Sequence, residues 1–274
     1  ELVLVPAIRF VRWILTRAME FGGLPATQAG YVGTNVISQA LEDRPLNSPV
    51  DTFRESDPDQ PLSDSLAERL RPKKESDWPA FMRLRELTER AGLLRYQGSR
   101  FQPRRDAEDL VNEPPALYHA LISAMFTQIP WDDHPRIGVI PYLREYGGFL
   151  FHLVGTLTER RGGPVAGKEL TDRFIAAAPP LAEKVAEEER NRRASEAIFG
   201  RHDLIRTALE HQFLYGFAET FGLVTIERQD QAIGQGKTTG PGHADQNGRS
   251  EQSSPADRGV RRDILFSPTP LYRA

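Results

Sequence analysis

Apolar and polar residues alternate along most of this chain with the period of amphipathic helices. The first such stretch is residues 6–21, which Pro6 can begin and the pair Gly22-Gly23 ends. The pattern therefore predicts a largely helical protein. Further helices are expected within residues 24–42, 76–92, 112–126, 142–163, 164–178, 181–200 and 202–222.

A few short segments have the composition of β-strands instead. The stretch "LLRYQGSRFQP" forms two extended pieces around Gly98, and "LVTIER" (residues 223–228) is rich in β-branched residues. Residues 264–266, Ile-Leu-Phe, are expected to pair with Val224–Ile226. The expected fold class is therefore mainly α with small β-hairpins.

The two halves of the chain repeat one order of elements. In each half an apolar helix ends in Gly-Gly, a short extended piece containing proline follows, and a second helix comes next. A third helix then ends in a Gly-Leu pair, Gly92-Leu93 or Gly222-Leu223, and leads into a hairpin. A helix, a small strand, two helices and a hairpin form the order of a winged helix-turn-helix. Two winged-helix-like modules are therefore predicted.

Composition marks two polar insertions. Residues 43–75 are proline-rich and are predicted to be a mobile connector with one short helix at Ser63–Leu70. Residues 229–260 have almost no aliphatic side chains and are predicted to be disordered. The expected domains are a first module at residues 1–126, a linker at 127–141 and a second module at 142–274, each module carrying one of the insertions.

Charge and composition exclude several classes of protein. The chain has no cysteine, which excludes disulfides and thiolate metal sites and fits a cytoplasmic location. Its net charge of −3 argues against a protein that coats DNA through overall basicity, while a local basic patch is compatible with it. No apolar run reaches the roughly 18 residues that cross a membrane, so no membrane partner is expected. Because the sequence begins at Glu1, we expect a trimmed chain that lacks an N-terminal partner domain.

Several segments resemble parts of uncharacterised bacterial proteins with tandem winged-helix-like modules. The similar segments are "GLPATQAG", "FMRLRELTERAGLLRYQGSRFQPRRDAEDLVNEPPALYHAL" and "FGLVTIER". Those proteins carry segments of the LPLT-x-x-G and AGLLR-x-x-x-G-x-L-x-x-T kind. The resemblance covers residues 6–42 and 76–126 well and the second half loosely. It implies a fold, and no activity comes with it.

A cluster of arginines in the first module is the candidate functional site. Between residues 83 and 105 there are seven arginines and only two acids, Glu86 and Glu89, in a chain that is acidic as a whole. Guanidinium groups on one exposed face can neutralise several phosphates, with the helix in the major groove and the hairpin over the backbone or minor groove. The candidate nucleic-acid-binding residues are Arg83, Arg85, Arg90, Arg95, Arg100, Arg104 and Arg105.

The same helix also has features of a solvated, salt-bridged face. Arg85–Glu89 and Glu86–Arg90 are i,i+4 pairs, and carboxylates on a groove-facing helix repel phosphate. Two interpretations therefore stay open. The protein is a regulatory or interaction protein that contacts double-stranded DNA through the first module's helix and wing, or it is a protein–protein scaffold that binds no nucleic acid. An accessory domain of an enzyme is a third, weaker interpretation.

No catalytic or metal-binding pattern is recognisable. The six histidines have no zinc-ligand spacing, and "WDDHPR" (residues 131–136) favours a proline-rich turn over a metal site. The stretch "GQGKTTGPG" (residues 234–242) resembles the end of a phosphate-binding loop but lacks the earlier glycine and the flanking strand and helix. We therefore predict no catalysis, no cofactor and no metal.

Overall fold

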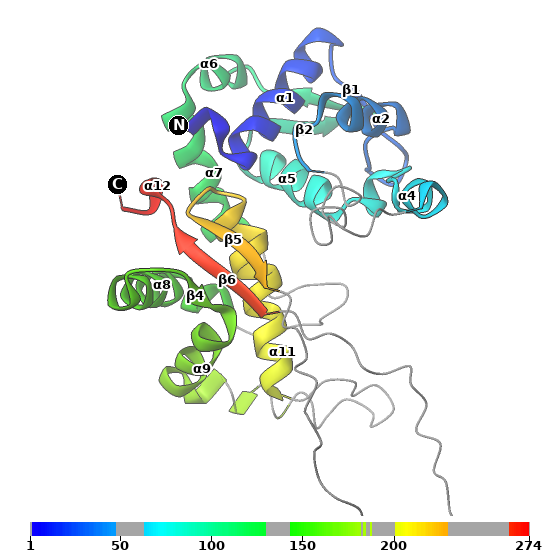
Figure 1. Ribbon diagram of the computed structural model, residues 1–274. Coiled ribbons are helices and arrows are strands. Elements are labelled where there is room, and N and C mark those ends of the chain that lie inside the picture. Colours follow the sequence, from blue (N-terminus) through cyan, green and yellow to red (C-terminus); the bar gives the residue numbers. More distant parts are fainter. Residues whose placement is uncertain are drawn as a thin grey trace, which may run out of the picture.

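The chain folds into two helical bodies, with one long helix leading from the first to the second. The computed structural model describes residues 2–47, 63–129, 143–181, 183–184, 187, 201–229 and 263–273. Figure 1 shows the first half as the upper body and the second half as the lower one, with α7 (Pro114–Gln128) running between them. Each half contains a three-stranded antiparallel sheet. The prediction of a mainly helical protein with small β-hairpins is confirmed, and the winged-helix assignment stays a prediction.

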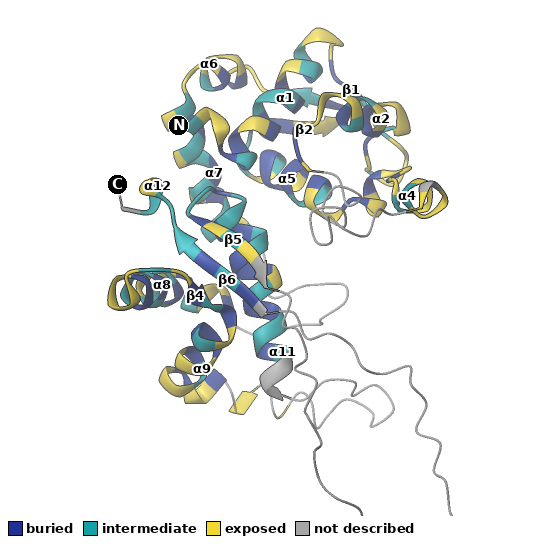
Figure 2. Cartoon of the chain, in the orientation of Figure 1, coloured by how far each residue is buried: buried dark blue, intermediate teal, exposed yellow. Residues whose placement is uncertain are grey.

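The first half is built around α1, whose apolar side is buried at the predicted positions Ile8, Val11, Ile14 and Ala18. Figure 2 shows buried residues along α1 and α5 and mostly exposed ones on α4. A helix that the sequence pattern did not indicate, α6, precedes α7. The elements in chain order are η1 (Leu2–Leu4), α1 (Pro6–Glu20), β1 (Leu24–Pro25), α2 (Thr34–Asp43), α4 (Asp64–Leu70), η2 (Glu75–Asp77), α5 (Pro79–Arg90), β2 (Leu94–Gln97), β3 (Arg100–Pro103), α6 (Ala107–Asn112) and α7.

The second half contains a π-helix, η4, which continues α11 without a break. In a π-helix the backbone bonds reach five residues along the chain, and the Thr220 hydroxyl donates to the Tyr215 carbonyl with the same separation, at 2.8 Å. The elements in chain order are η3 (Leu143–Tyr146), α8 (Gly147–Arg161), β4 (Val165–Ala166), α9 (Gly167–Ala177), α11 (Arg201–Ala208), η4 (Leu209–Glu219), β5 (Val224–Gln229), β6 (Asp263–Pro268) and α12 (Pro270–Arg273).

Both sheets place the strand that comes last in the sequence at their centre. The strand orders are β1-β3-β2 and β4-β6-β5, and every pairing is antiparallel. In the first sheet Leu24 lies opposite Phe101. In the second, Ile226 lies opposite Phe266, so the expected pairing of the last strand with Val224–Ile226 is confirmed. The two halves therefore share strand order as well as element order.

The Gly-Leu pairs end the third helix of each half in the same way. Gly92 and Gly222 have φ angles of +74° and +68°, in the left-handed region that glycine adopts without a steric cost. The next residue then turns back on the helix: Leu93 donates its N–H to the Thr88 carbonyl, and Leu223 donates to the Ala218 carbonyl. This is the Schellman pattern of a helix end. The repeated motif of the sequence is thus a repeated helix stop.

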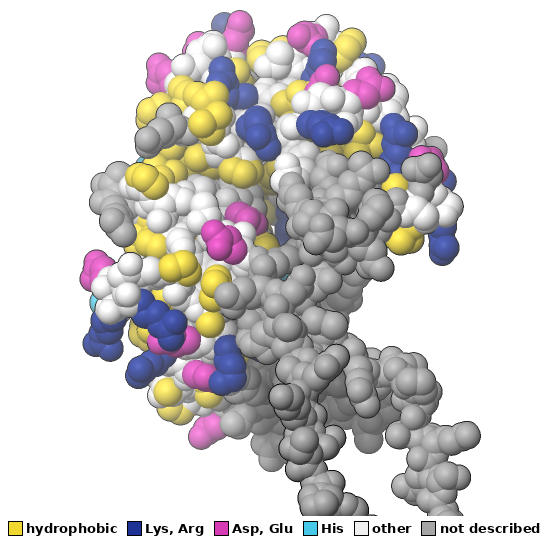
Figure 3. All heavy atoms as spheres, in the orientation of Figure 1, with side chains coloured by type: hydrophobic (Ala, Val, Ile, Leu, Met, Phe, Trp, Pro, Cys, Tyr) yellow, Lys and Arg dark blue, Asp and Glu magenta, His cyan; other side chains and the backbone are white. Residues whose placement is uncertain are grey.

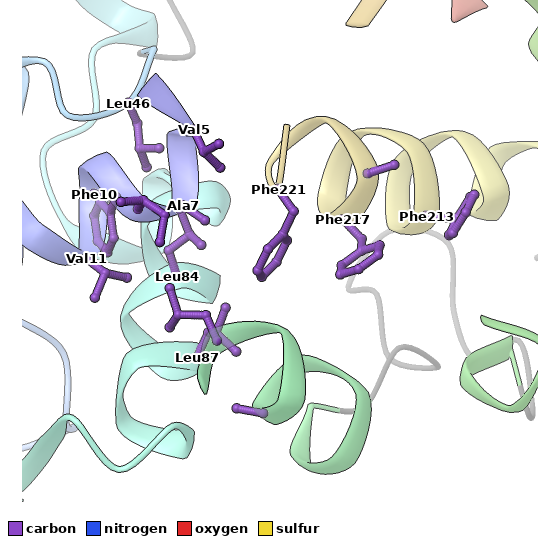
Figure 4. Close-up of a cluster of buried hydrophobic side chains, with 14 of the residues drawn as sticks. Val5, Ala7, Phe10, Val11, Leu46, Leu84, Leu87, Phe213, Phe217 and Phe221 are labelled. Atoms are coloured by element: carbon purple, nitrogen blue, oxygen red, sulfur yellow. The ribbon is translucent and has the colours of Figure 1, made fainter. Parts of the chain in front are cut away.

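Aromatic side chains hold the two bodies together. Figure 4 shows Phe213 and Phe217 of η4, and Phe221 just beyond its end, with their rings on one side of that helix. The Phe217 ring lies 5.3 Å from that of Phe126 on α7 and 5.2 Å from that of Phe151 on α8. Because α7 also packs against α1 and α5, the aromatic cluster connects both halves through one continuous core.

Two hydrogen bonds add polar contacts at this junction. The Ala7 amide of α1 donates to the Thr220 carbonyl at 3.0 Å, and the Tyr118 hydroxyl of α7 donates to the Phe221 carbonyl at 3.1 Å. Burial raises the pKa of Tyr118 from its ordinary value of 10.0 to about 12. The phenol therefore keeps its proton to a higher pH in the folded protein than in the unfolded one. The hydrogen bond that it donates in the folded protein is lost only above that pH.

Changing Tyr118 to Phe should make the protein less sensitive to alkali. A group whose pKa is raised by folding contributes stability that is complete below its unfolded pKa and is lost as the pH rises through the folded value. Wild-type Tm should therefore fall more steeply than that of Tyr118→Phe between about pH 10 and about pH 12, and the variant should lose about 1 kcal/mol at neutral pH. Melting curves across this range, with the exposed Tyr96→Phe as a control, measure the difference. Parallel Tm curves for wild type and Tyr118→Phe would contradict it.

The interval 43–75, predicted to be a mobile connector, contains ordered elements where the structure describes it. The expected short helix forms as α4, and the Ser63 hydroxyl caps it by accepting the Leu66 N–H. At the other end Glu75 is fully buried, so the prediction is wrong for that residue. Residues 48–62, residues 130–141 of the expected linker and residues 230–260 of the second insertion lie outside the described residues.

Candidate nucleic-acid interface

Arg85 is an internal residue of the first half rather than a surface cation. Its Nε donates to Oε1 of Glu75 at 2.8 Å, and its Nη1 bonds Glu89. The guanidinium carbon also lies 5.0 Å from the centroid of the Phe101 ring. With 6% of its side chain exposed, Arg85 cannot reach a phosphate. Its assignment to a nucleic-acid surface is therefore wrong.

Glu75 joins three segments of the first half through this ion pair. Its second carboxylate oxygen, Oε2, accepts the Val32 N–H at 2.6 Å in the segment before α2. Burial raises the pKa of Glu75, while the positive charge of Arg85 and the Val32 N–H act in the opposite direction. The sequence contains no local signal for this contact, because Glu75 lies ten residues before Arg85 and outside its helix.

Arg100 binds the backbone of its own module. Its Nη2 donates to the Phe21 carbonyl at 2.9 Å and to the Gly23 carbonyl, where the chain leaves α1 and enters β1. Space for this contact exists because residue 23 is glycine: a Cβ there would lie 3.2 Å from Nε of Arg100. The guanidinium therefore fastens the hairpin to the first strand, and this removes Arg100 from the phosphate-binding candidates.

Arg83 points into a cavity between the two halves. It is one of the residues that line the space between α5 and η4, together with Leu84 and Leu87 of its own helix and Tyr215 and Gly216 of η4. Burial lowers the pKa of Arg83, with Glu86 opposing the shift. This places Arg83 away from the hairpin and next to the second half of the chain.

The other four arginines are exposed around the hairpin. Arg90 lies in the last turn of α5, Arg95 in β2, and Arg104 and Arg105 follow β3. Arg95, Arg104 and Arg105 line one hollow of about 550 Å³, in which Asp106 and Asp109 also take part. Three arginines and two acidic residues thus lie around one hollow beside the hairpin.

The two glutamates of α5, Glu86 and Glu89, differ in their exposure and in their contacts with Arg85. Glu89 is engaged by Arg85, which compensates its charge inside the fold. Glu86 is exposed, and its Oε1 lies 3.7 Å from Nη2 of Arg85. The predicted i,i+4 pair Arg85–Glu89 forms, whereas no Glu86–Arg90 ion pair is present among the described residues. Of the two carboxylates that argued against phosphate binding, one is therefore neutralised.

Basic side chains do not form a continuous surface on the face seen in Figure 3. There, Lys and Arg side chains of both halves are interspersed with acidic and apolar ones. The described residues contain no cluster of three or more His, Cys, Asp or Glu that could hold a metal ion. Residues 131–136 and 234–242, considered above for metal and phosphate, lie outside the described part of the chain. Within that part, no helix is long and apolar enough to span a bilayer.

The candidate interface therefore no longer includes most of α5. It consists of the β2–β3 hairpin and the residues directly before and after it. Its exposed cations are Arg90, Arg95, Arg104 and Arg105, and the tyrosine next to Arg95, Tyr96, is 46% exposed. Exposed aromatic rings beside cations suit nucleic-acid contact. A scan of protein-family models and searches of curated proteins and of solved structures found no match to this chain.

Proposed function

We propose that this protein is a non-catalytic regulatory or interaction protein of the bacterial cytoplasm that contacts double-stranded DNA through the hairpin of its first half. The observation that carries the proposal is that Arg95, Arg104 and Arg105 are exposed and line one hollow, with Arg90 also exposed at the end of α5. Guanidinium groups bind phosphate through two parallel hydrogen bonds, and such contacts give affinity without reading the base sequence.

The element order supports the same proposal. Each half has helices, a short strand and two further antiparallel strands in the order expected of a winged-helix-like module, and the two sheets have the same strand order. In such modules the hairpin lies over the DNA backbone or minor groove. We assign the contact to the hairpin and not to the whole of α5, because Arg83, Leu84 and Leu87 of that helix line the cavity facing the second half.

A protein–protein scaffold is the second candidate function. The large hydrophobic side chains that are exposed among the described residues all belong to the first half: Val3, Leu4, Phe21, Tyr31, Leu66 and Tyr96. They are separate positions rather than one defined patch, and single exposed apolar residues are common on protein surfaces. DNA contact therefore has the more specific support.

A salt titration tests the DNA proposal. Fluorescence anisotropy of a labelled duplex, at about 50 mM and about 200 mM salt, should show wild-type binding that weakens steeply with salt. The variant Arg90→Ala/Arg95→Ala/Arg104→Ala/Arg105→Ala should bind weakly, and its salt slope should be smaller by about 3–4, since each phosphate neutralised contributes about 0.9.

A matched variant controls for the change in net charge. Arg144, Arg160, Arg161 and Arg173 are exposed arginines of the second half, and their replacement by Ala removes the same charge. This control should keep the wild-type affinity and salt slope. Equal losses in the two quadruple variants would show non-specific attraction, and the absence of wild-type binding at low salt would eliminate the proposal.

A further inference from the structure

A cavity of about 950 Å³ lies where the two halves of the molecule face each other. Its walls come from Leu46, the segment 69–77, α5 and the end of α7 in the first half, and from α11, η4 and the residues after η4 in the second. Figure 4 shows α5 and η4 on opposite sides of this region, with Leu84 and Leu87 on one element and Phe221 at the end of the other. Clefts between packed bodies with mainly apolar walls are typical sites for small molecules.

Arg83 places a cationic group in this largely apolar space. Its guanidinium has no hydrogen bond or ion pair with any residue that the structure describes, in contrast to Arg85 two positions along the same helix. Burial lowers the pKa of Arg83, and the nearby charge of Glu86 opposes this shift. Arg83 is partly buried, and an anionic ligand would give its guanidinium the partner that it lacks among the described residues.

Gly216 makes room for Arg83 in the opposite wall. A Cβ at residue 216 would lie 2.8 Å from Nη1 of Arg83 and 2.8 Å from the His211 carbonyl oxygen, closer than non-bonded atoms approach. Gly216 belongs to the π-helix η4, and π-helical turns occur frequently at functional sites. The Arg83 side chain of the first half therefore packs closely against the backbone at Gly216 in the second half.

The charges around the cavity favour an anion. Arg69, Arg71 and Lys73 line it together with Arg83, whereas Asp77 and Glu86 are the carboxylates among its described lining residues. The Asp77 carboxylate already accepts the backbone N–H groups of Lys73 and of the residue after it. The cavity therefore has an excess of positive charge in a protein whose overall charge is negative.

We propose that this cavity binds a small amphipathic carboxylate, with the carboxylate on the Arg83 guanidinium and the apolar body against Leu84, Leu87 and Tyr215. A carboxylate matches the two parallel N–H donors of one arginine. A free phosphate would leave the apolar walls uncovered, and an uncharged lipid would leave Arg83 unpaired. The ligand thus needs both an acid group and an apolar chain or ring, and it touches both halves of the protein at once.

Calorimetric titration of the full chain with octanoate tests the proposal. Wild type should bind octanoate saturably, should bind 1-octanol at least about tenfold more weakly, and should show no saturable binding of inorganic phosphate at the same site. Arg83→Gln should weaken octanoate binding by about tenfold, the effect of losing one charge-assisted contact. Arg160→Gln, an exposed arginine outside the cavity, should leave the octanoate affinity unchanged.

A second variant keeps the test decisive if Arg83→Gln folds poorly. Ala80 lines the cavity from an exposed position in the first turn of α5, so Ala80→Trp should obstruct it without disturbing the core. Wild-type thermal stability should rise with octanoate concentration, and that of Ala80→Trp should not. The proposal is overturned by the absence of saturable octanoate binding to wild type, by equal affinity for 1-octanol, or by unchanged affinity in a folded Arg83→Gln protein.

Discussion

Replacing Glu75 by Ala is expected to lower the free energy of unfolding by about 3 kcal/mol, the lower part of the range for breaking a buried ion pair. The change leaves the Arg85 guanidinium buried without its best-aligned carboxylate and the Val32 N–H without its acceptor. Arg85 keeps its bond to Glu89, which is why we expect the smaller end of the range. Urea unfolding monitored by circular dichroism measures the loss.

A double variant separates the ion pair from simple packing. Glu75→Leu/Arg85→Met replaces both charges by apolar side chains of similar length, and such exchanges are often neutral or stabilising. The double variant should therefore be more stable than either Glu75→Leu or Arg85→Met alone. Glu75→Ala with wild-type stability, or a double variant whose loss equals the sum of the two single losses, would show that the pair does not hold this region together.

Replacing Phe217 by Ala is expected to cost about 3–5 kcal/mol, as for other large aromatic side chains removed from a core. The ring is fully buried and contacts aromatic rings from α7, α8 and η4, so no single neighbour can move in to fill the space. The loss should appear in the unfolding of the whole protein, because these contacts connect the two halves. Phe217→Leu should cost less, since most of the volume is kept.

Phe149→Ala is the matched control for this prediction. Phe149 is also an aromatic residue of the second half, but it is only partly buried and packs at the edge of the core, with its ring 6.1 Å from that of Phe174. Its loss should be clearly smaller than that of Phe217. Equal costs for the two variants, or a Phe217→Ala protein in which one half unfolds at an unchanged urea concentration, would refute a shared core.

The sequence predicted most of the helices, helix ends and strands, because these depend on the residue types within short segments. Helix stops such as Gly92-Leu93 follow from the conformational freedom of glycine, and the pairing of Ile226 with Phe266 follows from two short apolar strands. The repeated order of elements was visible for the same reason. The π-helix was not predicted: the apolar pattern of residues 202–222 indicated one α-helix, whereas Leu209–Glu219 forms η4 in the structure.

The candidate site was less predictable, because the partners of its arginines are distant in the sequence. Arg100 binds carbonyl groups more than seventy positions earlier, and Arg85 binds a glutamate from outside its own helix. Charge counting along the chain treats all seven arginines alike. Only the fold separates those that stabilise it from Arg90, Arg95, Arg104 and Arg105, which stay exposed.

The central position of β6 has a consequence for synthesis of the chain on the ribosome. In the first half all three strands have been made once residue 103 is complete, so that sheet can close while translation continues. In the second half β4 and β5 are not paired with each other, and each pairs with β6, residues 263–268. The apolar surface that β6 covers therefore stays open until residue 268 has been made, and during that interval chaperone binding or mispairing with the finished first sheet would compete with folding.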